Sequence, residues 1–175
     1  MDQKLRELHA SLGIPTTYRK TTKLACFSAP TALVSIDDDV FGRPQQLDQR
    51  AAAAWFAMRD HAKSDGITLQ VVSAYRSAEY QAEVIQRSLD KGDRIEEILL
   101  RIAAPGFSEH QSGRALDLTT PGFESVEEEF ETSKAFTWLT KNAQQYGFEL
   151  SYPRDNPYGV IYEPWHWCYR GVQNF

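Results

Sequence analysis

The 175-residue chain has few cysteines, no long apolar run and no excess of positive charge. Cys26 and Cys168 form at most one disulfide, and such sparse cysteine usage fits a reducing compartment. No apolar run approaches the 18 residues of a membrane-spanning helix, so we expect no membrane span. The 19 basic and 24 acidic side chains give a net charge of −5. Nucleic-acid binding needs a basic face, so this composition argues against a nucleic-acid partner.

The N-terminal stretch MDQKLRELHASLG is charged throughout and lacks the apolar centre of a secretory signal. We therefore predict a cytoplasmic protein. A chain from which a leader had been removed would look the same, and that protein would be periplasmic.

The length and the 42% hydrophobic content suit one domain, residues 1–175, with a hydrophobic core. Apolar spacing and capping residues predict helices near residues 5–12, 44–62, 77–85, 93–103 and 133–146. Alternating or β-branched runs predict strands near residues 32–36, 67–73, 115–119, 148–151 and 160–169. This order of elements predicts an α+β fold in which helices flank a small antiparallel sheet.

Two polar residues stand out around the predicted strand ALDLT, residues 115–119. Side chains alternate between the faces of a strand, so Leu116 and Leu118 are expected to face the core while Asp117 faces the other way. His110 lies seven positions before Asp117, in the Gly-flanked stretch GFSEHQSG. A histidine and an acid in this arrangement are either surface residues or two of the three protein ligands of a metal site.

The stretch EPWHWCYRG, residues 163–171, supplies the third ligand candidate. Alternation places Trp165, Trp167 and Tyr169 on one face, which we interpret as core, and His166 on the other with Cys168. Two histidines and a carboxylate are a sufficient ligand set for catalytic zinc. Glu163 is a further carboxylate that is available as a base for the attacking water.

These stretches carry a family resemblance. Residues 108–117, SEHQSGRALD, match the pattern S-x-H-x-x-G-x-A-x-D, and residues 163–166, EPWH, match E-x-W-H. In this order the two motifs resemble the zinc D-alanyl-D-alanine carboxypeptidases of the VanY type, in the superfamily shared with hedgehog amino-terminal domains. The upstream stretch SAYRS, residues 73–77, resembles the third signature of that family. The similarity covers about residues 45–171, and residues 1–44 form an N-terminal extension of unclear role.

The resemblance implies a hedgehog/DD-peptidase-like fold and a site that holds one zinc ion per chain. By the family pattern, the zinc ligands are His110, Asp117 and His166. Glu163 is implied as the catalytic base. Arg76 is implied to contact an anionic part of the substrate or of its transition state. A guanidinium suits a terminal carboxylate because it binds both oxygens at once.

The resemblance also suggests the substrate pocket. Ser108 is expected to line the pocket, and Tyr75 lies beside Arg76 in the same motif. Cys168 is a departure, because the family often has a large or basic residue at that position. On the strand interpretation it lies on the same side as His166, where it is a pocket wall, a filler or a fourth, inhibitory ligand; we favour a pocket wall or filler.

The family resemblance implies a metallo-carboxypeptidase that removes a terminal D-alanine from peptidoglycan stem peptides or muropeptides. A D,D-carboxypeptidase cuts D-Ala-D-Ala, whereas an L,D-carboxypeptidase cuts before the D-alanine of a tetrapeptide, and the motifs do not separate them. The charged N-terminus favours the L,D reaction, since a cytosolic enzyme would meet tetrapeptides during wall recycling. Two alternatives are a zinc-containing binding module without catalysis and an endolysin that cuts L-Ala-D-Glu.

Overall fold

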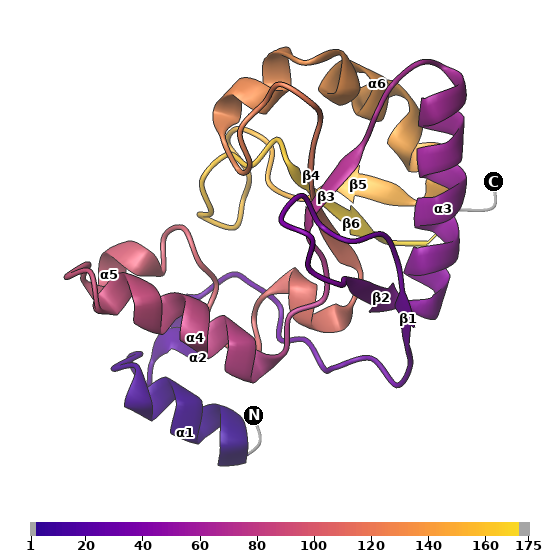
Figure 1. The fold of residues 1–175 in the computed structure, drawn as a ribbon. Coiled ribbons are helices and arrows are strands. Elements are labelled where there is room, and N and C mark those ends of the chain that lie inside the picture. Colours follow the sequence, from indigo (N-terminus) through magenta and orange to yellow (C-terminus); the bar gives the residue numbers. More distant parts are fainter. Residues whose placement is uncertain (1–2, 172–175) are drawn as a thin grey trace.

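A four-stranded antiparallel sheet forms the centre of the computed structural model, which describes residues 3–171 (Figure 1). The strands lie in the order β3-β4-β6-β5, with the bounds β3 Gln70–Ser73, β4 Ala115–Thr119, β5 Phe148–Leu150 and β6 His166–Tyr169. A second, two-stranded antiparallel sheet pairs β1 Leu33–Ser35 with β2 Gln46–Asp48. Together with the helices, this arrangement confirms the predicted α+β class.

The helices lie in two groups on either side of the central sheet (Figure 1). One group consists of α3 Gln49–Ser64, α6 Lys134–Asn142 and two 3-10 helices, η2 Glu128–Thr132 and η3 Ala143–Tyr146. The other consists of α1 Gln3–Ser11, α2 Tyr18–Thr21, α4 Ala78–Leu89 and α5 Ile95–Ile98. The 3-10 helix η1 Glu109–Ser112 leads into β4. No helix within residues 3–171 is long and apolar enough to cross a membrane.

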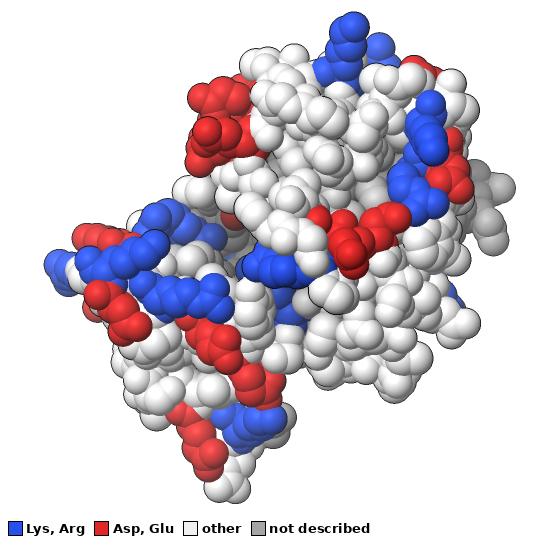
Figure 2. All heavy atoms as spheres, in the orientation of Figure 1, with Lys and Arg blue, Asp and Glu red and all other residues white. Residues whose placement is uncertain are grey.

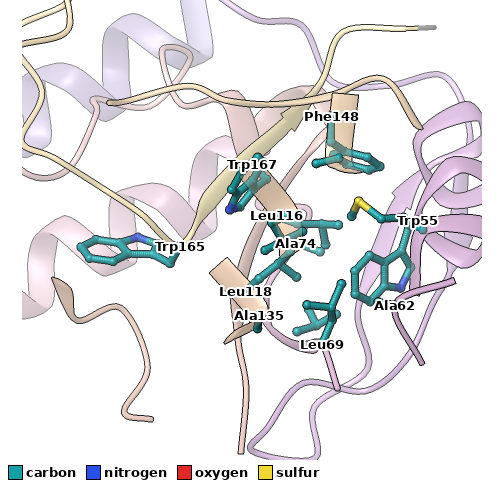
Figure 3. Close-up of a cluster of buried hydrophobic side chains, with 14 of the residues drawn as sticks. Trp55, Ala62, Leu69, Ala74, Leu116, Leu118, Ala135, Phe148, Trp165 and Trp167 are labelled. Atoms are coloured by element: carbon teal, nitrogen blue, oxygen red, sulfur yellow. The ribbon is translucent and has the colours of Figure 1, made fainter. Parts of the chain in front are cut away.

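The main core lies between the sheet and the group that contains α3 and α6. Leu116 and Leu118 of β4 pack there with Trp55 of α3 and Phe148 of β5 (Figure 3). This confirms the predicted alternation along β4, because Asp117 between the two leucines is directed to the opposite face, where it lines a cleft.

A second apolar cluster joins the N-terminal segment to the helices that lie beyond the other face of the sheet. Its buried members are Leu12, Ile14, Ala82, Ile85, Ile98, Ala104 and Phe107. The backbone amide of Phe27 donates to the carbonyl of Gly106 at 2.7 Å, and the Gln111 side chain donates to the carbonyl of Phe27 at 3.1 Å. Part of the N-terminal extension thus packs against the segment that precedes η1.

Two of the predicted helix starts were wrong. Helix α3 begins at Gln49 instead of Pro44, because buried Leu47 belongs to β2 and pairs with Val34, and Asp48 caps the helix by accepting from the Arg50 amide. Helix α5 covers only Ile95–Ile98 and has no side-chain cap.

Two predicted caps were right, and three predicted elements were too long. Ser77 accepts from the Tyr80 amide and Ser133 from the Phe136 amide, as expected for the caps of α4 and α6. The region predicted as a helix to residue 103 forms only α5, which ends at Ile98, and Asp93 binds Arg101 at 2.9 Å instead of capping the helix. Strands β3 and β6 are also shorter than the runs 67–73 and 160–169.

Gly113 ends η1 in the left-handed region, with φ of 68°, where a side chain is unfavourable. A Cβ atom there would lie 3.0 Å from the backbone nitrogen of Asp48. We therefore expect Gly113→Ala to lower the melting temperature more than Gly122→Ala, since Gly122 has φ of 90° but a Cβ atom there would have no neighbour within 4 Å. The backbone cost alone is about 1–2 kcal/mol. Equal melting temperatures for the two variants would show that the contact with Asp48 adds nothing.

Candidate active site

Strand pairing brings two of the predicted ligands together. In the β4–β6 ladder Asp117 lies directly opposite His166, so both side chains project from the same face of the sheet. The Nδ1 atom of His166 lies 3.0 Å from Oδ1 of Asp117. The 3-10 helix η1 adds His110, whose Nε2 lies 3.1 Å from Oδ2 of Asp117. The three ligand atoms all lie within 4.8 Å of one another, so the side chains of all three predicted ligands meet.

The orientation of His110 suits a metal ligand. Its Nδ1 lies 2.6 Å from the carbonyl oxygen of Ala74, which can only accept, so Nδ1 carries the proton. Its Nε2 is buried and forms no hydrogen bond, because it faces Oδ2 of Asp117 without a proton to donate. A buried nitrogen with a free lone pair beside a carboxylate and a second imidazole matches the donor set of zinc. The residues present therefore fit the metal that the sequence predicted.

Burial and charge keep His110 and Asp117 in the forms that a metal needs. Burial, reinforced by the nearby Arg76, lowers the pKa of His110 to about 4, so its imidazole is neutral. Burial alone raises the pKa of Asp117, but its contacts with His110 and His166, of which His166 carries the positive charge, outweigh burial and lower that pKa below its ordinary value. A neutral imidazole and an ionised carboxylate are both ready to bind a cation.

Both ring nitrogens of His166 have acidic neighbours. Its Nε2 lies 2.9 Å from Oε2 of Glu109, on the side away from Asp117. Burial alone lowers the pKa of His166, but the hydrogen bonds to Asp117 and Glu109 raise it to about 10. A cation that binds through Nδ1 must therefore displace a proton. The sequence prediction did not include Glu109, which occupies the unspecified position of the S-x-H motif.

Glu163 lies beside the three ligands without joining them. Its Oε2 is 3.7 Å from Nδ1 of His166, and its side chain lines the same cleft. Burial raises the pKa of Glu163 to about 7, an effect that nearby Asp117 reinforces and His166 and Arg76 oppose. A carboxylate with a pKa near the working pH is suited to accept and return a proton.

Arg76 extends from the segment after β3 into the cleft. Its Nη2 lies 3.4 Å from Oδ2 of Asp117, and its Nη1 donates to Oε1 of Gln81 at 3.3 Å. The Nε atom of Arg76 is buried and has no hydrogen-bond partner. The guanidinium is therefore fixed on one side and keeps an unused donor, as a binding site for an anionic group requires.

His110, Asp117, His166, Glu163 and Arg76 all line a cleft of about 350 Å³. Figure 2 shows a hollow in the surface between the helical group of α1, α4 and α5 and the rest of the molecule. Ser108 lines this cleft, as predicted. The apolar side chains in its wall are Leu24, Leu99, Leu100, Ile102, Val126, Val160, Ile161 and Trp165. The cleft is thus polar at the candidate metal site and mostly apolar elsewhere.

Comparison with known proteins identifies the family. Residues 44–172 match the family VanY, D-alanyl-D-alanine carboxypeptidase. The chain belongs to this family. The match starts and ends within one residue of the region that the sequence motifs predicted, residues 45–171. It also confirms the resemblance that those motifs indicated.

Individual VanY-family relatives show how far the similarity extends. A Bacillus subtilis (strain 168) protein, YodJ, named for carboxypeptidase activity, is 36% identical over an alignment of 152 residues. The match covers 81% of this chain and 54% of that protein. The structure of the LdcB LD-carboxypeptidase has 32% identity and a TM-score of 0.73, over 82% of this chain and 70% of that one. The chain thus spans about half the length of YodJ.

A second VanY-family structure bears on the metal. The vancomycin resistance D,D-pentapeptidase VanY from the VanB-type cassette was solved in complex with Zn(II). It has 29% identity and a TM-score of 0.63, and the match covers 83% of this chain and 84% of that one. Together with the group formed by His110, Asp117 and His166, this complex supports zinc as the metal for this chain.

Two residues predicted to bind substrate are not brought to the cleft. Cys168 is 1% exposed, and its sulfur lies 4.0 Å from the carbonyl oxygen of Tyr169. Tyr75 is half-buried, and neither residue lines the cleft. Cys168 lies opposite Ala115 inside the sheet, two residues beyond His166, so it fills space beneath the site instead of forming a wall.

The aromatic stripe of β6 was predicted to be core, and its members differ. Trp167 is buried in the main core, and Tyr169 packs against that core. Trp165 also has contacts in the core, but it lines the cleft as well, and it lies apart from the other labelled side chains in Figure 3. Trp165 precedes the first residue of β6, so the strict alternation of a strand does not fix its direction.

Proposed function

We propose that the chain is a zinc-dependent carboxypeptidase that hydrolyses the bond before a C-terminal D-alanine of peptidoglycan stem peptides. The observation that carries this proposal is the convergence of His110, Asp117 and His166 in the cleft that Glu163 and Arg76 also line. Each chain would hold one zinc ion through the two imidazoles and the carboxylate. When bound, zinc acidifies water and polarises a carbonyl group.

Residues of the chain supply proton transfer, substrate binding and the exclusion of water. Glu163 accepts a proton from the attacking water and passes it to the nitrogen of the departing D-alanine. Arg76 pairs with the terminal carboxylate of the peptide, which orients the scissile bond. The apolar walls exclude water and leave Glu163 in the surroundings that raise its pKa. Each of these steps uses a group that lines the same cleft.

Within this reaction we favour L,D-carboxypeptidase activity on tetrapeptides. The residue before the D-alanine then has a long, largely aliphatic side chain, either lysine or diaminopimelate. The apolar wall that includes Leu100, Val126 and Ile161 supports such a side chain, and these residues are 58%, 44% and 43% exposed before any substrate binds. The likeness to the LdcB LD-carboxypeptidase supports the same choice. The alternative is D,D-carboxypeptidase activity, which the name D,D-pentapeptidase of the Zn(II)-bound relative supports.

Mass spectrometry of digested muropeptides tests the proposal. Purified protein loaded with zinc is incubated with tri-, tetra- and pentapeptide muropeptides and with intact sacculi. Loss of one alanine from the tetrapeptide alone supports the L,D reaction, and loss from the pentapeptide alone supports the D,D reaction. Zinc binding without any hydrolysis would indicate a binding module. Solubilised sacculi would indicate an endolysin, because a carboxypeptidase releases only free D-alanine.

Arg76→Lys keeps the positive charge and removes the planar pair of donors. We expect kcat/KM to fall about 10- to 100-fold while zinc stays bound, because a hydrogen bond to a charged group contributes about 1.5–3 kcal/mol. Arg87→Lys is the matched control, since Arg87 lies on α4 with a largely exposed side chain that pairs with Glu83. The measurement is steady-state D-alanine release together with zinc content.

Peptides with an amidated C-terminus test the same contact from the substrate side. We expect the parent protein to lose most of its activity on them, because the amide offers Arg76 no negative charge. Equal rates on amidated and free peptides would show that no terminal carboxylate is bound by Arg76.

A further inference from the structure

A buried carboxylate contacts His166 on the side away from Asp117, and it also lines the cleft. Glu109 is 6% exposed, and its Oε2 accepts from Nε2 of His166 at 2.9 Å and from the hydroxyl of Ser151 at 2.6 Å. Its Oε1 accepts from Nη2 of Arg170 at 2.5 Å. Arg170 also donates to the Ser151 hydroxyl at 3.1 Å, so the three partners of Glu109 form one connected network.

This network determines which nitrogen of His166 is left for a metal. The Glu109 carboxylate only accepts, so Nε2 keeps its proton, and Nδ1, which faces Asp117, is the nitrogen that a cation would bind by displacing a proton. A metal-binding histidine commonly donates its second N–H to such a group, which fixes the ring and strengthens the ligand. We propose that Glu109, held in place by Arg170 and Ser151, is a positioning residue for His166. This inference rests on the proposed function, because it assumes that His166 binds the metal.

Arg170 supplies this network with its cation. Residues 166, 168 and 170 alternate onto the same side of the chain, and Cys168 between the other two is buried. The backbone amide of Arg170 donates to the Gly147 carbonyl at 2.7 Å, which fixes the start of its side chain. The backbone of Arg170 is thus anchored where its guanidinium reaches the Glu109 carboxylate.

A purely structural ion pair is the competing explanation of the same contacts. Removing it would lower the stability of the fold without changing the affinity for a metal ion in the folded protein. A positioning role predicts the opposite, because the affinity depends on the direction and basicity of the His166 ring. Zinc affinity of the folded protein is therefore the measurement that separates the two.

The experiment measures zinc affinity by competition with a chromophoric chelator, on variants whose circular dichroism shows that they are folded. We expect Glu109→Gln to weaken zinc binding about 10- to 100-fold, as is typical when the partner of a ligating histidine is changed. Arg170→Met should weaken it in the same direction by a smaller factor. Glu124→Gln is the matched control, because it makes the same chemical change at an exposed position. The control should bind zinc like the parent protein.

Parent-like affinity in both Glu109→Gln and Arg170→Met would overturn the positioning role. Because affinity is the readout, this failure is distinct from absent peptide hydrolysis, which contradicts the proposed function.

Discussion

Glu163→Gln is expected to abolish most peptide hydrolysis while the protein keeps its zinc. Glutamine preserves the shape of the side chain and can still hydrogen-bond, but it cannot take a proton from water and give it to the leaving nitrogen. General acid–base catalysis contributes about 10²- to 10⁴-fold, so the rate should fall by at least that order. Glu163 lies 3.7 Å from His166 and outside the group of three ligands, which is why metal binding should survive.

The measurement pairs turnover with zinc content for the same protein sample. Glu124→Gln is a suitable control, because it makes the same chemical change at an exposed position. KM should change little, since Arg76 and the cleft walls remain. Parent-like turnover in Glu163→Gln would show that the base lies elsewhere and that Glu163 is only a buried acid.

The pH dependence of kcat/KM for the parent protein also tests the role of Glu163 as the base. Only the ionised carboxylate accepts a proton, so kcat/KM should decline as the pH falls through the pKa of this group. Burial raises that pKa to about 7, and the positive charge of a bound zinc ion lowers it from there. We therefore expect an acid limb at or below about pH 7. A flat profile between about pH 8 and pH 5 would contradict this role.

Regular alternation along strands made most of the site predictable from the sequence. Asp117 lies between two leucines and His166 between two tryptophans, so each had to point away from the apolar side of its strand. The structure pairs these two residues directly across the β4–β6 ladder. His110 needed the family motif, because it lies on a 3-10 helix whose direction no strand or helix period gives.

Residues whose partners are distant in the sequence were harder to predict. Glu109 lies next to a ligand, but its partners Ser151 and Arg170 are 42 and 61 residues away, so only the folded chain shows that it touches His166. The one sequence signal for this contact was that residues 166 and 170 lie on the same side of an extended chain. The false helix start at Pro44 has a similar cause, because the pairing of β2 with β1 overrides local helix signals.

Asp117→Ala is expected to fail in a different way from Glu163→Gln: it should lose the metal as well as the activity. The Asp117 carboxylate lies 3.1 Å from Nε2 of His110 and 3.0 Å from Nδ1 of His166, and it is the only acid of the three-ligand group. Alanine removes both a ligand and the charge that faces the two imidazoles.

Zinc stoichiometry after dialysis, together with turnover, measures the effect of Asp117→Ala. The parent protein should retain about one zinc per chain, lose activity on exhaustive chelation and regain it when zinc is returned. The variant should retain little zinc, and added zinc should restore little activity. Acid should weaken zinc binding in the parent, because protons compete for the histidines. If Asp117→Ala keeps its zinc while Glu163→Gln loses it, the two acids have exchanged roles and Glu163 is the ligand.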